Sequence, residues 1–155
     1  MEFIDIINAA PLVSVDLIIQ NKNKEILLGK RLNRPAKGFW FAPGGRIKKN
    51  ETLDNAIARV SQTELGMTLK KQNSWFLGGY DHIYTDNYLN KDNINTHYVA
   101  LGYAFMLSEN PKIKIDVQHS EITWLSVEEL LNHPEVHSNM KAYFNQTDFF
   151  KNPPV

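Results

Sequence analysis

The apolar positions of the chain fall into short runs separated by polar turns. Residues 12–20 and 26–32 are rich in Val, Ile and Leu, and the polar stretch between them predicts a β-hairpin. Residues 74–84 and 96–107 predict two further strands, the first with a bulge at its paired glycines. A short strand is expected over 121–125.

Helical spacing of apolar residues appears between and after these strands. It is clearest over 52–66, where Gly66 stands at the position of a C-cap. Ser126 is a good N-cap for the VEELLN segment, and an amphipathic helix is expected over 134–146. Strands combined with helices predict an α/β fold around a mixed sheet. No repeat or linker divides the chain, so we expect one domain over 1–155.

Composition narrows the classes of partner. The 155 residues include 17 basic and 17 acidic side chains, for a formal net charge of zero. This balance argues against a nucleic-acid polymer or a membrane surface as partner. No apolar run approaches the roughly 20 residues that span a bilayer, and the N-terminus lacks a basic signal region, so a cytoplasmic location is expected. The absence of cysteine excludes disulfides, thiol nucleophiles and cysteine metal sites.

The basic residues are unevenly distributed. Only four of the 17 are arginines, and all four lie between positions 31 and 59. Guanidinium groups bind phosphate oxygens in pairs, which lysine does not do. The stretch therefore predicts a phosphate site.

A spaced pattern of glycine and charged residues lies within that stretch. Gly45 is followed by Glu51, then Arg59, and then Glu64. Val60 and Glu64 share one helix face, and a carboxylate on a face built for the core needs a cation or a metal. The spacing resembles the Nudix box, G-x5-E-x7-R-E-U-x-E-E-x-G-U, where U is a bulky aliphatic residue.

This sequence departs from the box at three positions. Val60, Ser61 and Thr63 stand where the pattern has a glutamate, a bulky aliphatic residue and the first of two paired glutamates. One carboxylate, Glu64, remains at a position that binds metal in the family. The resemblance implies a Nudix-type α/β/α sandwich around a mixed sheet, with Mg²⁺ as cofactor.

The segments LVSVDLII, LLGKRLNRPAKGFWFAPGGR, THYV and QH resemble the GDP-mannose mannosyl hydrolases within that superfamily. The resemblance runs from about Phe3 to Phe144. It implies Mg²⁺-dependent hydrolysis of GDP-mannose, with GDP-glucose as a second candidate substrate. Water attacks the anomeric carbon with inversion in these enzymes. It also implies a homodimer with an N-terminal arm, residues 1–11, at its interface.

The same resemblance assigns roles to individual residues. It implies catalytic roles for His119, Arg31, Arg46, Arg59, Tyr98 and Asp16. It implies substrate contacts by Glu2, Phe3, Lys30, Arg31, Arg46, His82, Tyr84 and Tyr98. The metal ligands it implies are the Gly44 carbonyl, Glu64 and Gln118. His119 is the expected general base, because an imidazole titrates near pH 6.5.

Plainer interpretations stand beside these roles. Arg59 can form a salt bridge with Glu51, the strand tyrosines can be core residues, and Asp16 can face water. We expect Arg34 to lie in an exposed loop without a role in phosphate binding, and His97 to be structural. We expect His133 and His137 to be solvated. Two other functions remain open: a conventional Nudix pyrophosphatase that attacks phosphorus, and a nucleotide-binding module without turnover.

Overall fold

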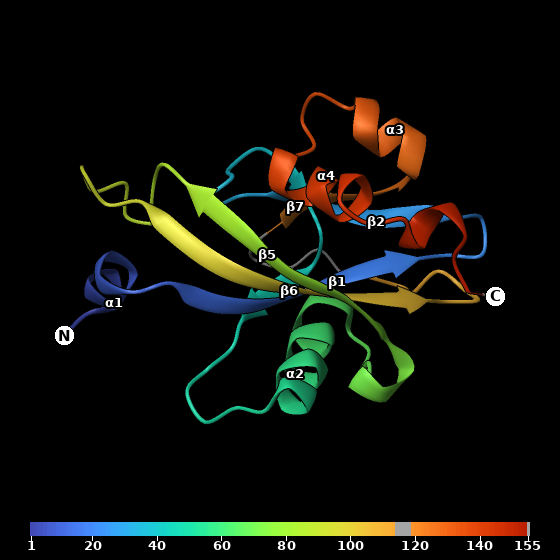
Figure 1. Ribbon diagram of the computed structural model, residues 1–155, viewed down its shortest axis with the longest axis horizontal. Helices are drawn as coiled ribbons and strands as arrows, with labels where there is room; N and C mark the ends of the chain where they lie inside the picture. Colours follow the sequence, from blue (N-terminus) through green and yellow to red (C-terminus); the bar gives the residue numbers. More distant parts are fainter. Residues whose placement is uncertain (114–118, 155) are drawn as a thin grey trace.

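The computed structural model describes residues 1–113 and 119–154, and for residues 119 and 120 it describes the backbone only. A seven-stranded mixed sheet forms its centre (Figure 1). The strands are β1 (Leu12–Gln20), β2 (Glu25–Arg31), β3 (Trp40–Phe41), β4 (Gly44–Arg46), β5 (Trp75–Tyr84), β6 (Thr96–Met106) and β7 (His119–Ser126). Their order is β3-β2-β1-β6-β5, while β4 pairs with β1 and β7 pairs with β2.

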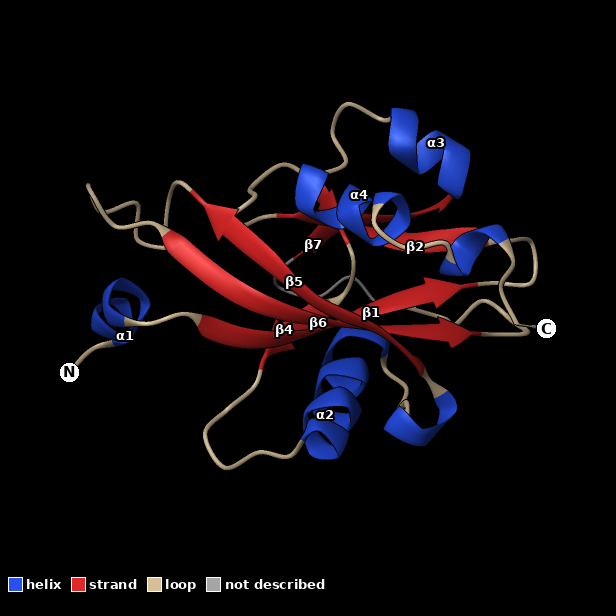
Figure 2. Cartoon of the chain, in the orientation of Figure 1, coloured by secondary structure: helices blue, strands red, loops and turns tan. Residues whose placement is uncertain are grey.

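Helices cover both faces of this sheet (Figure 2). They are α1 (Phe3–Ala9), α2 (Leu53–Leu65), α3 (Val127–Asn132) and α4 (Ser138–Asn145), with short 3-10 helices at Lys71–Asn73 and Phe149–Lys151. Helix α2 lies on one face, and α3 and α4 lie on the other. The predicted mixed α/β sandwich is therefore confirmed. None of the helices in the described ranges is long and apolar enough to cross a membrane.

Strand β1 separates two hydrophobic cores, because successive side chains of a strand point to opposite faces. Leu17 packs in the core beneath α2, with Ile57 and other residues of that helix. Ile18 packs in the core beneath α4, with Met140 and Tyr143. Asp16 shares the α4 face with Ile18, as the alternation predicts.

Helix α2 is the predicted helix over 52–66, and local signals define both of its ends. The Thr52 side chain accepts a hydrogen bond from the Asn55 amide at 3.1 Å, which caps the N-terminus. Gly66 ends the helix in the left-handed conformation, with φ of 72°. Ala56, Ile57 and Val60 form its buried face.

The structure differs from the predicted elements at three places. The hairpin pairs only at its turn, Gln20 with Ile26, because β1 then pairs with β6 and β4. Residues 3–9 form a helix that the sequence did not predict, with Ile4 and Ile7 buried. The last helix is shorter than 134–146, since it begins after His137, whose ring caps it. The bulge in β5 is present between Phe76 and Gly78.

Candidate active site

A cavity of about 230 Å³ opens on the face of the sheet that carries Asp16, where six strands and the N-terminal helix meet. Its lining residues are Phe3, Ser14, Asp16, Arg31, Pro35, Phe41, Ala42, Gly44, Gly45, Arg46, His82, Tyr84 and Tyr98. Most of the residues predicted to contact substrate are thus brought together from segments far apart in the sequence.

Asp16 lines this cavity and is only 6% exposed. The Tyr143 hydroxyl donates a hydrogen bond to Asp16 Oδ2 at 2.6 Å, and His82 Nδ1 lies 3.8 Å from the same oxygen. Burial raises the pKa of Asp16 to about 6, against the opposing effects of Tyr143 and the Arg31 charge. The alternative interpretation, in which Asp16 faces water, is therefore wrong, and the carboxylate has the partner that its place in an apolar strand predicts.

His82 is buried beside Asp16, at 3% exposure. Its ring makes edge contacts with Phe41 and Tyr143, at centroid distances of 5.6 and 5.7 Å. Burial and the neighbouring His137 lower its pKa to about 4, so the imidazole is neutral at physiological pH. A neutral imidazole next to a carboxylate offers hydrogen-bonding groups suited to sugar hydroxyls.

Two arginines supply the positive charge of the cavity. Arg31 Nε donates to the Pro35 carbonyl at 2.8 Å, which fixes part of its side chain. The Arg46 guanidinium lies 4.4 Å from the centre of the Phe3 ring, a cation–π contact. Burial raises the pKa of Tyr98, whereas both arginines oppose that rise, so the phenol and the two cations share one electrostatic environment.

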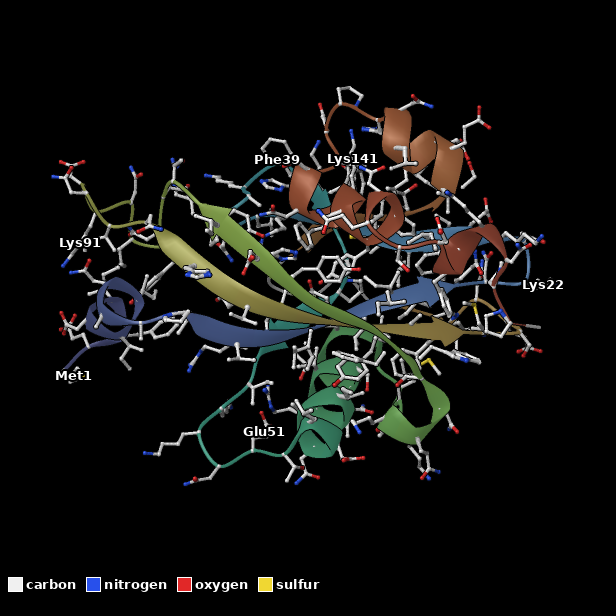
Figure 3. All side chains as sticks on the ribbon, viewed as in Figure 1. Met1, Lys22, Phe39, Glu51, Lys91 and Lys141 are labelled. Atoms are coloured by element: carbon white, nitrogen blue, oxygen red, sulfur yellow. The ribbon has the colours of Figure 1, made fainter. Side chains whose placement is uncertain are left out.

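Arg59 does not line the cavity. Its Nε and Nη2 donate to the two Glu51 carboxylate oxygens at 2.7 and 2.9 Å, and Nη2 also donates to the Arg46 carbonyl at 2.9 Å. Glu51 lies beside the start of α2 (Figure 3). Of the two interpretations of Arg59, the structure shows the salt bridge, through which the residue holds the strand that carries Arg46.

The predicted metal ligands are described only in part. Glu64 is a buried residue of α2, at 6% exposure, and it borders a small hollow of about 10 Å³ together with Pro43. Pro43 directly precedes Gly44, whose carbonyl is the second predicted ligand. Gln118 lies outside the described residues. Among the described residues, no group of three or more His, Cys, Asp or Glu side chains is placed to hold a metal. The Glu64 carboxylate and the Gly44 carbonyl both offer oxygen atoms, and oxygen ligands suit a hard cation such as Mg²⁺.

His119, the predicted base, begins β7 directly opposite Arg31 of β2. This pairing brings the backbone of His119 next to a strand that lines the cavity. The structure describes only the backbone of this residue.

The altered box positions are accommodated in different ways. Val60 is 2% exposed and packs in the core beneath α2. A Cβ atom on Gly45 would lie 2.9 Å from Val60 Cγ2, so this glycine permits β4 to approach the helix closely. Thr63 is exposed on the outer side of α2.

Other predicted contacts lie away from the cavity. Lys30 pairs with Glu135 at 3.2 Å, and Glu2 caps α1 without lining the cavity. Phe3 lines the cavity of its own chain, whereas the resemblance implies that the N-terminal arm lies at a dimer interface. Arg34 pairs with Asp86 at 3.3 Å and is not among the residues that line the cavity.

Two residues near the site were missed by the sequence analysis. His137 was expected to be solvated, but its ring packs between Phe39 and Tyr84, and burial lowers its pKa. Tyr143 is fully buried and bonded to Asp16. Its spacing in the last helix indicated only a core residue.

Comparison with known proteins defines the class. A model of the NUDIX domain matches residues 10–146, so the chain belongs to the Nudix family. Nudix hydrolases act on small nucleotide derivatives and generally use divalent metals. The solved MutT NUDIX hydrolase from Burkholderia pseudomallei has the same fold, with a TM-score of 0.70 and 26% identity. The alignment covers 89% of this chain and 98% of that one.

Two relatives carry more specific names. The low-salt glycan biosynthesis protein Agl8 of Haloferax volcanii is 39% identical over 118 residues, which is 76% of this chain and 72% of that protein. The ADP-ribose pyrophosphatase of Methanocaldococcus jannaschii is 45% identical over 60 residues, which is 39% of this chain and 35% of that protein.

Proposed function

We propose that this chain hydrolyses GDP-mannose, with GDP-glucose as a second candidate substrate, to GDP and the free sugar. The observation that carries the proposal is the composition of one cavity. Arg31 and Arg46 give it positive charge suited to a diphosphate, while buried Asp16 and neutral His82 give it groups suited to sugar hydroxyls. A nucleotide sugar carries both a diphosphate and sugar hydroxyls.

The altered Nudix box supports attack on carbon. Attack on phosphorus requires an activated water molecule beside the phosphate. In the wider family, the carboxylates of the Nudix box help to activate that water. Here Val60 is a core residue and Thr63 is exposed, so Glu64 is the carboxylate left at a metal position. Attack on the anomeric carbon instead needs a base beside the sugar and stabilisation of the departing diphosphate.

In the proposed reaction, His119 takes a proton from water as the water oxygen bonds to the anomeric carbon. The bond between that carbon and the bridging oxygen breaks, and the oxygen leaves with GDP. Arg31 and Arg46 bind the diphosphate, and Tyr98 lies beside them. Attack opposite the leaving group inverts the anomeric centre.

The proposed metal ligands are the Glu64 carboxylate, the Gly44 carbonyl and Gln118. A Mg²⁺ ion held by these residues would supply positive charge to offset the negative charge on a departing diphosphate. Because GDP is then a good leaving group, the reaction needs no carboxylic acid to protonate it. The role of Arg59 in the proposed reaction is to hold the strand that carries Arg46, through its hydrogen bond to the Arg46 carbonyl.

The name of the Haloferax volcanii relative, a glycan biosynthesis protein, also agrees with a nucleotide-sugar substrate. A second candidate is phosphoanhydride cleavage, which the local 45% identity to an ADP-ribose pyrophosphatase favours. The homodimer stays a prediction, which sedimentation of the purified chain would test.

One experiment separates these functions. The purified chain is incubated with GDP-mannose and Mg²⁺ in ¹⁸O-labelled water, and the products are analysed by mass spectrometry. Label on free mannose with unlabelled GDP supports attack on carbon. Formation of GMP and mannose 1-phosphate would refute it in favour of the pyrophosphatase. Binding without products would indicate a non-catalytic module.

A further inference from the structure

Asp16 lies between two glycines, one on each neighbouring strand. The parallel pairing of β1 with β6 places Gly102 beside it, and the antiparallel pairing with β4 places Gly44 on the other side. A Cβ atom on Gly44 would lie 2.5 Å from Asp16 Oδ1. A Cβ atom on Gly102 would overlap the ring of Tyr143, with its Cδ1 at 3.0 Å. Both missing side chains therefore leave room around this carboxylate.

The space above Gly102 is filled by Tyr143. This residue comes from α4, is fully buried, and packs against Tyr80 with a ring-centroid distance of 4.5 Å. Its hydroxyl donates to Asp16 Oδ2 at 2.6 Å, a short distance typical of a hydrogen bond to a charged acceptor. Burial and the neighbouring Asp16 raise the pKa of Tyr143, so the hydroxyl keeps its proton and acts as a donor.

The two oxygens of Asp16 therefore have different surroundings. Oδ2 is engaged by Tyr143, while Oδ1 lies on the side of Gly44, a residue that lines the cavity. Tyr143 itself does not line the cavity. Its ring contacts His82 and its hydroxyl bonds to Asp16, and of these two cavity residues only Asp16 is held by the hydroxyl.

We propose that Tyr143 is a positioning residue for the proposed reaction: its hydroxyl fixes the rotation of the Asp16 carboxylate, so that Oδ1 accepts a hydrogen bond from a sugar hydroxyl. Gly102 is the position that admits the tyrosine ring. This role rests on the proposed function, and it extends the site to the C-terminal helix, outside the Nudix box.

The test replaces the hydroxyl alone, with Tyr143→Phe. Tyr80→Phe is the matched control, because Tyr80 is a buried neighbour whose hydroxyl lies near the Leu77 carbonyl instead. We expect Tyr143→Phe to lower kcat for GDP-mannose about tenfold or more, as loss of a hydrogen bond to a charged group does. GDP affinity, measured by calorimetry, stays within about twofold because the hydroxyl lies at the sugar end. Tyr80→Phe keeps the wild-type kcat.

A double-mutant cycle identifies the route of the effect. In an Asp16→Asn background, Tyr143→Phe should change kcat by less than about twofold. Gly102→Ala should reproduce the loss of Tyr143→Phe, because the added methyl group displaces the ring. Equal losses in both backgrounds, or parallel losses of GDP affinity, would overturn the proposal in favour of a general structural role.

Two further outcomes separate this proposal from the proposed function. If the wild-type chain releases no mannose, both fail. If it releases mannose and Tyr143→Phe matches it, only the role of Tyr143 fails. Should Tyr143→Phe not fold, 3-fluorotyrosine at position 143 keeps the ring and changes the acidity of the hydroxyl. An unchanged kcat in that variant would refute the role.

Discussion

The Glu51–Arg59 pair makes the stability of the chain depend on pH. Both carboxylate oxygens of Glu51 accept hydrogen bonds from Arg59, and the Lys48 amide donates to Oε1 at 3.1 Å. These contacts, above all the bond from Arg59, lower the pKa of Glu51 from 4.5 to about 2. A pKa that is lower in the folded state stabilises it above pH 4.5, and this contribution disappears as the pH falls toward 2.

The size of the effect follows from the same contacts. Each pKa unit corresponds to about 1.4 kcal/mol, so the fall from 4.5 to about 2 sets an upper bound of about 3.5 kcal/mol. The Arg59 side chain is 33% exposed, and solvent screening reduces such pairs. We therefore expect Glu51→Gln to lower the free energy of unfolding by about 1–2 kcal/mol at pH 7.

The assay is urea unfolding followed by tryptophan fluorescence, for the wild-type chain and Glu51→Gln, at pH 7 and near pH 2.5. The difference between the two chains should shrink to a small fraction of its neutral value at the lower pH. Glu109→Gln, at an exposed loop position, is the control and should be close to neutral at both. A difference that stays constant between the two pH values would refute the role of the carboxylate charge.

Other predictions concern the site and one helix end. His119→Gln should lower kcat by about 10²-fold or more, and wild-type turnover would exclude it as the base. Glu64→Gln should abolish most turnover and weaken the Mg²⁺ dependence in a metal titration; an unchanged titration curve would exclude it as a ligand. Arg31→Ala should lower kcat/KM at least about tenfold, whereas Arg34→Ala keeps it, and equal losses would contradict this difference. Gly66→Ala should cost about 1 kcal/mol in urea unfolding, because φ is 72° there, and an unchanged midpoint would contradict that strain.

The elements that the sequence predicts well are those with local causes. Helix α2 is specified by its cap at Thr52, its apolar spacing and Gly66, and the structure agrees with all three. Helix α1 has only seven residues, too few for periodicity to distinguish a helix from an extended arm. Its buried face forms through packing of Ile4 and Ile7 with Leu12, which no local pattern reveals.

The residues of the site also divide into those with a local signal in the sequence and those without one. Asp16 could be identified from the sequence because an acid within an apolar strand requires a partner. That partner, Tyr143, lies 127 residues further along the chain and is spaced like any core residue of a helix. The strands were recognised from β-branched residues, but the pairing of β1 with β6 is a contact between distant segments, so the extent of the hairpin was not predictable.

The two faces of β1 also bear on how such a domain can change its substrate. Leu17 belongs to the core beneath α2, while Asp16, one residue earlier, lines the cavity and accepts a hydrogen bond from Tyr143 of α4. Substitutions in α4 can therefore reshape the end of the cavity around Asp16 while the packing of the box helix is retained. Because the two faces of β1 pack against different helices, the surroundings of Asp16 can vary while the core beneath α2 is preserved.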